Sequence, residues 1–349
     1  MMVGEQLIEF VRSRRGDYVD PAAPESALQS LGLDDATLAR WRSSTDVIAT
    51  LPHASPNVFF PRVRVSWYAG RLQAREPDTH HVRLCLTHVN LSDLGWRPYA
   101  WWYLDERGDL AELRLSTRNK KRKHAVVSSV GPINGPPPGA SGADLDAGNA
   151  ASWGRDHAVS SMLILSTVER AAGMSESGRT TYVPFDELVS FVRDRSDGPG
   201  SDPLTRWSKG VLAHADGRRK GPDGRLRPCD PIEADVFDHN SNMALLSLLG
   251  DPRVLGGAKM TGYWPAVKSR VDAVRADSGV DASTPHPVEV PDVDLTPIAS
   301  PSFGVREQLR QAGIEYSQSM AVHEHGRFAA TDGPFIDRLA ESVTNSKGS

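Results

Sequence analysis

Cysteine is nearly absent from this chain, and other informative features are missing altogether. Only Cys85 and Cys229 occur among 349 residues, which is too few for a disulfide framework or a cysteine-based zinc site. No apolar run approaches the roughly 20 residues that a bilayer-spanning helix needs. The first residues also lack the basic segment and apolar core of a signal peptide. We therefore expect a cytoplasmic protein that does not act at a membrane.

Motifs that would identify a nucleotide or hydrolase site are missing too. The sequence contains no glycine-rich dinucleotide fingerprint after a predicted strand, no phosphate loop ending in Gly-Lys-Ser/Thr and no Gly-x-Ser-x-Gly turn. Its 24% share of charged residues and formal net charge of −4 are ordinary for a globular protein. Arginine, alanine and glycine are plentiful, which is typical of GC-rich bacterial coding. Composition therefore leaves the reaction class open.

Positive charge is concentrated in two short segments of this slightly acidic chain. Packed cations repel one another, and a bridging anion relieves the repulsion; phosphate backbones are the commonest such anion. We therefore predict that both segments contact DNA or another nucleic acid. The cations of the first segment are Arg118, Lys120, Lys121, Arg122 and Lys123, and those of the second are Arg218, Arg219, Lys220, Arg225 and Arg227.

Residues 25–42 resemble a helix-turn-helix. A small residue in the first predicted helix, a glycine in the turn and an apolar pair in the second helix let two helices cross closely. The resemblance implies that Arg40 and Arg42 face a phosphate backbone, although Asp34 and Asp35 at the reading end would repel DNA. The alternative is an ordinary helical pair packed beside a sheet.

Acidic residues beside the second cationic segment suggest a metal-dependent nuclease. Phosphodiester cleavage needs carboxylates that hold a divalent metal next to cations that hold the phosphate. The candidate catalytic residues are Asp230, Glu233, Asp235 and His239, with Asp105, Asp109 and Glu112 on a predicted hairpin as the alternative set. The cofactor would be Mg²⁺. These acids have no fixed metal-ligand spacing, so they could instead neutralise the cationic loop or cap a helix.

Periodicity predicts an α+β protein with N-terminal helices, an antiparallel β-sheet and a helix-rich C-terminal region. The predicted N-terminal helices are 4–14, 24–31 and 36–43, and the predicted strands are 58–60, 63–67, 81–86, 99–103 and 110–115. Later helices are predicted at 159–172, 185–195, 203–213, 240–249 and 263–276. The Pro/Gly-rich segment 131–150 is predicted to be a linker or loop.

Five regions follow from this pattern. They are 1–130 (helices and sheet, the candidate nucleic-acid-binding region), 131–150 (linker), 151–280 (helix-rich), 281–302 (Pro-rich loop) and 303–349 (C-terminal helix and hairpin). The leading interpretation is a bacterial DNA-binding protein, in its catalytic form a metal-dependent nuclease of a restriction or defence type. One alternative is an enzyme that acts on a small phosphorylated or anionic metabolite. A second is a non-catalytic scaffold, whose apolar helix 157–172 would contact a protein partner or a second copy.

Overall fold

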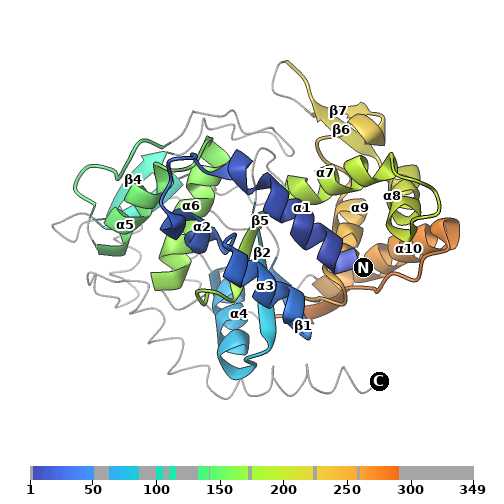
Figure 1. Cartoon of the computed structure of the whole chain (residues 1–349), viewed down its shortest axis with the longest axis horizontal. Coiled ribbons are helices and arrows are strands. Elements are labelled where there is room, and N and C mark those ends of the chain that lie inside the picture. Colours follow the sequence, from blue (N-terminus) through green and yellow to red (C-terminus); the bar gives the residue numbers. More distant parts are fainter. Residues whose placement is uncertain are drawn as a thin grey trace.

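A five-stranded parallel β-sheet forms the centre of the protein (Figure 1). The computed structural model describes residues 3–50, 63–85, 100–104, 110–114, 133–140, 142–171, 175–222, 226–257 and 260–290. The sheet strands are β1 (Asp46–Thr50), β2 (Thr79–Cys85), β5 (Thr180–Pro184), β8 (Arg253–Gly256) and β9 (His286–Glu289), in the order β5-β2-β1-β8-β9. Two antiparallel hairpins are separate from it: β3 (Ala100–Leu104) with β4 (Leu110–Arg114), and β6 (Gly217–Lys220) with β7 (Leu226–Cys229).

Helices make most of the connections, because parallel neighbours cannot be joined by a tight turn. The described helices are α1 (Val3–Tyr18), α2 (Glu25–Leu31), α3 (Asp35–Ser43), α4 (Val63–Arg75), α5 (Gly142–Ala151), α6 (His157–Ala171), α7 (Phe185–Ser196), α8 (Pro203–His214), α9 (His239–Ala244) and α10 (Met260–Ser278). Two 3₁₀ turns, Pro231–Glu233 and Leu245–Leu249, flank α9. Helix α4 joins β1 to β2, and α10 joins β8 to β9.

Several helix ends follow local signals in the sequence. Helix α2 ends at Gly32, whose φ of 65° is left-handed and therefore favours glycine. The Asp34 side chain accepts a hydrogen bond from the backbone N–H of Thr37 at 3.0 Å and caps α3. Asp202 caps α8 in the same way, and Pro203 occupies the first helical position, where no N–H is needed.

One face of the sheet is mostly apolar, with His80 and Thr181 as buried polar exceptions. Strand side chains alternate between faces, and the register places Ala49, Val82 and Val254 on the same side. These residues belong to the main buried cluster, together with side chains from α1, α3, α7 and α10. Each Val or Leu fully removed from water contributes about 1.5–3 kcal/mol. Burial on this face therefore holds these four helices against the sheet.

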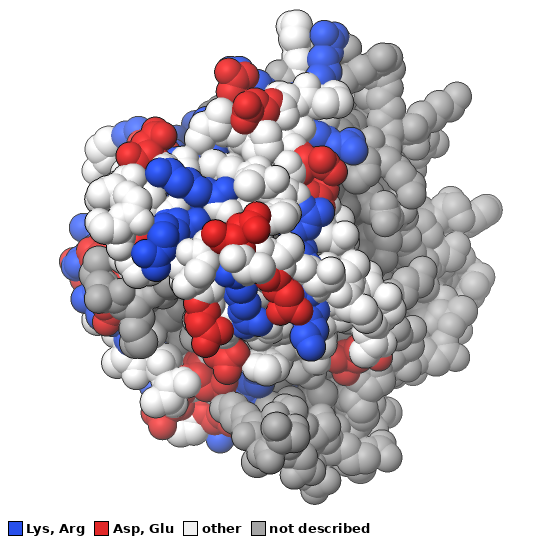
Figure 2. All heavy atoms as spheres, turned by 90° about the vertical axis from the view of Figure 1, so that its right-hand side faces the viewer, with Lys and Arg blue, Asp and Glu red and all other residues white. Residues whose placement is uncertain are grey.

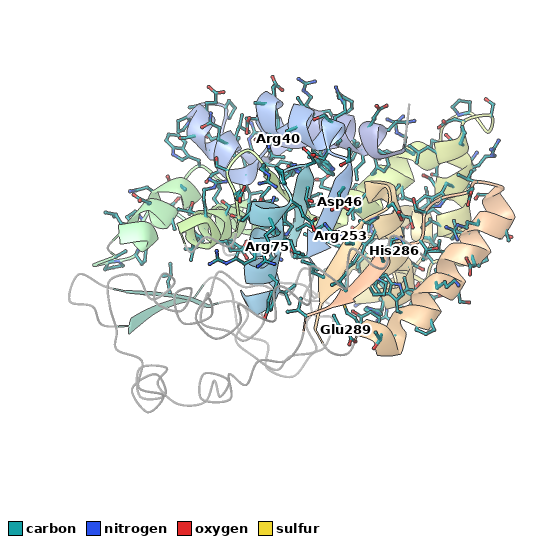
Figure 3. The ribbon with its side chains drawn as sticks, turned by 90° about the horizontal axis from the view of Figure 1, so that it is seen from below. Arg40, Asp46, Arg75, Arg253, His286 and Glu289 are labelled. Atoms are coloured by element: carbon teal, nitrogen blue, oxygen red, sulfur yellow. The ribbon has the colours of Figure 1, made fainter. Side chains whose placement is uncertain are left out.

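The opposite face of the sheet is polar although it is buried. Helix α4 lies on it, because the Gln73 side chain is hydrogen-bonded to the hydroxyl of Thr180 at 3.1 Å. The register aligns the side chains of this face across neighbouring strands. The buried polar members are Thr50, Thr79, His81, Arg83, Thr180, Tyr182 and Arg253. Figure 3 shows Arg40 of α3 and Arg75 of α4 on the two sides of the sheet.

The prediction of an antiparallel sheet is wrong. All four strand pairs of the central sheet are parallel, so the protein has an α/β fold. Among the described strands, antiparallel pairing occurs only in two hairpins, of which β3–β4 was predicted. The error arose because most of the parallel strands have only four or five residues and are separated by long helical segments. Their pairing partners lie far away in the sequence.

Three local predictions also need correction. Residues 63–67 were predicted as a strand but begin helix α4. The predicted loop 131–150 contains helix α5, and the predicted loop 281–302 contains strand β9. The predicted strand 58–60 and the predicted C-terminal helix and hairpin lie outside the described residues.

Strands from three of the predicted regions join one sheet: β1 and β2 from 1–130, β5 and β8 from 151–280, and β9 from 281–302. The region boundaries themselves stay predictions. In the part of the chain that the structure describes, no helix combines the length and apolar character needed to cross a bilayer.

Candidate functional site

The strand order reverses direction between β1 and β8. From β1 the chain passes through α4 to β2, whereas β8 lies on the other side of β1 and continues through α10 to β9. Helix α4 covers the polar face, and α10 packs through Met260 with the apolar cluster. At such a reversal the connections diverge, and ligands of open α/β sheets bind outside the carboxyl ends of the strands. The ends of β1 and β8, at Thr50 and Gly256, therefore define the candidate site.

A buried ion pair lies beneath this edge of the sheet. The Arg83 guanidinium of β2 donates to the Glu169 carboxylate of α6 at 3.1–3.2 Å, and both side chains are 2% exposed. The Tyr182 hydroxyl of β5 donates to the same carboxylate at 3.0 Å and lies 3.0 Å from the Ser175 hydroxyl. Removing one partner of a buried pair costs about 3–5 kcal/mol. The pair therefore fixes α6 against β2 and β5.

Protonation states in this cluster follow from burial and charge. Burial alone would lower the pKa of Arg83, but the Glu169 carboxylate raises it above its ordinary value. Burial, reinforced by Glu169, raises the pKa of Tyr182 well above its usual range. Burial also raises the pKa of the Cys85 thiol to about 12. At neutral pH the arginine is charged and the phenol and thiol are protonated, so Cys85 is not a reactive thiolate.

Thr50, the last residue of β1, is held by two partners on β2. Its hydroxyl oxygen lies 2.9 Å from Nε2 of His81 and accepts from Nη1 of Arg83 at 3.4 Å. Arginine can only donate, so the hydroxyl proton of Thr50 is available to His81. Burial lowers the pKa of His81 well below its usual range, and Arg83 adds to the effect. This histidine is a weak base, and the arrangement positions Thr50 rather than activating it.

At the end of β8, helix α10 approaches the backbone closely at Gly256, and space is open beside Gly257. A Cβ at Gly256 would overlap the Met260 sulfur, so glycine lets α10 approach the strand. Among the described residues, a Cβ at Gly257 would meet no atom within 4 Å. On neighbouring β9, Glu289 accepts from the backbone N–H and the hydroxyl of Thr261 at 2.9 and 2.7 Å, and these bonds lower its pKa. This edge therefore combines open space at Gly257 with a fixed carboxylate.

A second polar cluster lies at the opposite, amino ends of the strands (Figure 3). Arg253 of β8 forms ion pairs with Asp46 of β1 and with Glu76, which follows α4. The Thr79 hydroxyl of β2 lies 3.0 Å from both carboxylates. The cluster connects the starts of β1, β2 and β8. It stabilises the strand order and lies away from the edge where ligands of α/β sheets bind.

The second cationic segment forms the hairpin β6–β7. Arg218, Arg219 and Arg227 are exposed, and Arg219 lies directly opposite Arg227 across the two strands. Arg219 also pairs with Glu233 at 3.3 Å. The structure thus gathers three of the predicted nucleic-acid contacts on one hairpin. Whether they bind nucleic acid stays a prediction.

The first predicted catalytic set is spread around the base of this hairpin. The Asp230 side chain caps the 3₁₀ turn that follows β7. The ring of His239 meets Tyr263 edge-on, with 5.0 Å between centroids. Within the described ranges, no three His, Cys, Asp or Glu side chains gather as a group that could hold a metal ion. The members of this set, which do not form such a group among themselves, are Asp230, Glu233, Asp235 and His239. Whether they act in catalysis stays a prediction.

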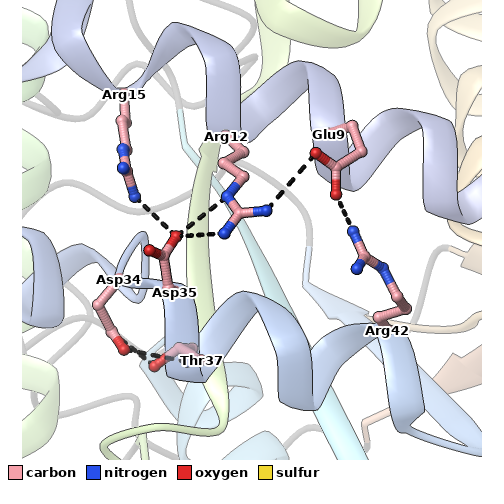
Figure 4. Close-up of polar contacts among 7 residues, drawn as sticks. All are labelled: Glu9, Arg12, Arg15, Asp34, Asp35, Thr37 and Arg42. Atoms are coloured by element: carbon pink, nitrogen blue, oxygen red, sulfur yellow. Dashed lines mark hydrogen bonds and ion pairs between the residues drawn. The ribbon is translucent and has the colours of Figure 1, made fainter.

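The predicted helix-turn-helix segment does form two helices, α2 and α3 (Figure 1), and Figure 4 shows the contacts of α3 with α1. Asp35 of α3 accepts hydrogen bonds from two arginines of α1, the nearer at 2.7 Å, and these bonds lower its pKa. Arg42 pairs with Glu9 of α1, and Arg40 donates to the carbonyl of Pro77 at 3.4 Å. Charged side chains of α3 are thus engaged by α1 and by a neighbouring loop. This arrangement is compatible with a helical pair packed beside a sheet, and contact of Arg40 and Arg42 with DNA stays a prediction.

Other predicted residues lie outside the described part of the chain. They are Asp105, Asp109, Arg118, Lys120, Lys121, Arg122, Lys123 and Arg225. Of Glu112 and Lys220 only the backbone is described, in β4 and β6. Predictions on these residues stay untested.

Sequence reasoning missed the polar face of the sheet. A signal was present, because polar residues recur at every second position in 79–83 and at Thr180 and Tyr182. Such alternation normally indicates a strand with one solvent-exposed face. Here the alternating face is buried, and only the pairing of distant strands reveals it.

No protein-family model, curated protein or solved structure matches this chain.

Proposed function

We propose that the chain binds a small polar molecule at the carboxyl ends of β1 and β8. The observation that carries the proposal is the reversal of strand order between these two strands, with α4 and α10 on opposite faces. This geometry separates the connections that leave the two strands. Ligands of open α/β sheets bind in the resulting crevice, whatever their chemistry.

The groups along this edge favour a ligand with several hydroxyl groups. The Thr50 hydroxyl is buried and already held by Arg83 and His81, so it fixes the end of β1 rather than contacting the ligand. The space beside Gly257 allows close contact with the backbone of β8. The carboxylate of Glu289 can accept hydrogen bonds from ligand hydroxyls, as it does from Thr261. Sugar phosphates and nucleoside phosphates carry such hydroxyl groups, and a small phosphorylated metabolite is therefore the ligand class that we propose.

The cytoplasm is the compartment that we propose. Cys85 and Cys229 are both free thiols, and free thiols persist in reducing compartments. Phosphorylated metabolites are available there as ligands.

The proposal can be tested with ligand-induced stabilisation and two glycine substitutions. Gly257→Leu fills the space at the end of β8, whereas Gly200→Leu fills equally open space in the turn before α8. Melting temperatures are measured for both variants and the parent with a panel of sugar phosphates and nucleoside mono-, di- and triphosphates. A ligand at a hundred times its Kd stabilises a protein by about 2.7 kcal/mol.

We expect at least one ligand of the panel to raise the melting temperature of the parent and of Gly200→Leu but not of Gly257→Leu. Equal stabilisation of Gly257→Leu and the parent would place the ligand elsewhere. A panel that stabilises none of the three proteins would contradict the proposal as a whole.

A further inference from the structure

The hairpin β6–β7 is a small region of strong positive charge on a chain of opposite net charge. Residues 217–229 contain five Lys or Arg and one Asp, a net charge of +4, whereas the whole chain has −4. In Figure 1 the hairpin extends from the part of the molecule formed by α7 and α8. Figure 2 views the molecule from the side of α8 and α10 and shows Lys and Arg interspersed with Asp and Glu. The concentration of cations is thus a property of the hairpin.

The register of the hairpin places cations on both of its faces. Arg219 pairs directly with Arg227, so their side chains share one face, and Arg218 lies on the other. Like charges directly opposite each other on two strands are destabilising. An anion between Arg219 and Arg227 would remove that cost.

The acidic partner of Arg219 is easily replaced. Arg219 and Glu233 lie 3.3 Å apart, and each side chain is 59% exposed. An exposed ion pair of this kind contributes about 0–1 kcal/mol and weakens with salt. A phosphate could therefore take the place of Glu233 at little cost.

We propose that the β6–β7 hairpin binds double-stranded DNA, with Arg218, Arg219 and Arg227 contacting phosphates on the two sides of a groove. The major groove of B-form DNA, about 12 Å wide, admits a two-stranded β-ribbon. Residues 217–229 contain no Phe, Tyr or Trp, so the hairpin lacks the rings that stack unpaired bases. The major groove of A-form RNA is too narrow for side chains to read. This binding is independent of the small-molecule site, since it concerns a different part of the chain.

The test compares two triple variants of equal charge change in the full chain. Arg218→Ala, Arg219→Ala and Arg227→Ala remove the hairpin cations. The control removes three exposed cations of α8 and α10: Arg206→Ala, Lys209→Ala and Lys268→Ala. Fluorescence anisotropy measures the Kd for a short labelled DNA duplex at several salt concentrations. The same measurement is made with single-stranded DNA of the same sequence and with the corresponding RNA duplex.

The parent should bind duplex DNA more tightly than either other probe, and its affinity should fall with salt. The hairpin variant should bind duplex DNA roughly tenfold more weakly or worse, with a salt slope reduced by about 0.9 for each phosphate that it no longer neutralises. The control variant should keep the Kd and slope of the parent. The proposal is overturned if the parent does not bind duplex DNA, if it prefers single strands or RNA, or if both variants bind equally weakly. Unchanged melting temperatures of both variants exclude unfolding as the cause.

Discussion

Two adjacent histidines on β2 are buried on opposite faces of the sheet and carry their protons on different nitrogens. The Thr181 hydroxyl donates to the carbonyl of Gly32 at 3.1 Å, so its oxygen accepts from Nε2–H of His80. Thr50 instead accepts from Arg83, and its proton is available to Nε2 of His81. The first ring is therefore a donor at Nε2 and the second an acceptor. The acceptor role of His81 requires a neutral imidazole ring, whereas a ring in either protonation state can donate from Nε2.

Acid should destabilise the protein through these two histidines. Burial, with Arg179 and Arg40, lowers the pKa of His80 to about 3, and the pKa of His81 is also well below its usual range. Above about pH 6.5 both histidines are neutral in the folded and unfolded chain, and neither affects stability. Below it only the unfolded chain takes up the protons. The free energy of unfolding should then fall by about 1.4 kcal/mol per pH unit for each histidine until the folded-state pKa is reached.

Urea unfolding at a series of pH values measures this effect. Carboxylates also titrate in acid, so the informative quantity is the difference between the parent and a variant. His80→Gln with His81→Gln keeps hydrogen-bonding groups near the two threonines but removes both titrations. The double variant should lose less stability than the parent between about pH 6.5 and pH 5. Equal losses would mean that neither histidine is neutral and buried in the folded protein.

Exposed cationic residues could be identified from the sequence, but the charged residues of the core could not. Arg218 and Arg227 could be identified because they lie close together in the sequence. Arg83 and its partner Glu169 are 86 residues apart, and each is an ordinary charged residue by type. Their importance arises from burial, which depends on how β2, β5 and α6 pack. No local pattern encodes that packing.

Secondary-structure elements with local end signals were predicted correctly. Gly32 caps the end of α2, Asp34 caps the start of α3, and Pro203 occupies the first position of α8. Helix α4 was predicted as a strand because Val63, Val65 and Trp67 alternate with polar residues. Its buried side chains instead include polar Ser66 and Gln73 beside Tyr68, Ala69 and Leu72. Tyr68, Ala69 and Leu72 lie on one helix face, so the period-two pattern of 63–67 was misleading because it covers only five residues.

Two neighbouring aspartates at the start of α3 should differ in their effect on stability. Asp34 caps the helix by accepting from the backbone N–H and the hydroxyl of Thr37 at 3.0 and 2.7 Å. Replacing a capping aspartate by alanine costs about 1 kcal/mol. Asp35 instead pairs with arginines of α1 at the surface (Figure 4), where ion pairs contribute less.

Urea unfolding of Asp34→Ala and Asp35→Ala, at equal ionic strength, measures this difference. The first substitution should lower the free energy of unfolding by the larger amount. Added salt should reduce the effect of the second substitution more than that of the first. An equal or larger loss from Asp35→Ala would show that the α1–α3 ion pairs, rather than the cap, hold this helix.

For the whole molecule, the position of β1 decides where the site lies. Strand β1 pairs with β2, which follows soon after it, and with β8, which follows much later. The first pairing is typical of a strand, helix and strand in succession. The second pairing creates the reversal of strand order, and no local feature of the sequence indicates it. The small-molecule proposal therefore rests on a pairing that only the three-dimensional structure provides.

Backbone amide nuclear Overhauser effects in a deuterated sample test this pairing most directly. The account predicts contacts between β1 and β8 in parallel register, with Ile48 beside Arg253, Ala49 beside Val254 and Thr50 beside Leu255. Contacts from β1 to β2, with Ala49 beside Val82, serve as an internal control in the same spectrum. Finding the β1–β2 contacts without those between β1 and β8, or finding β8 antiparallel to β1, would contradict the reversal and the site that depends on it.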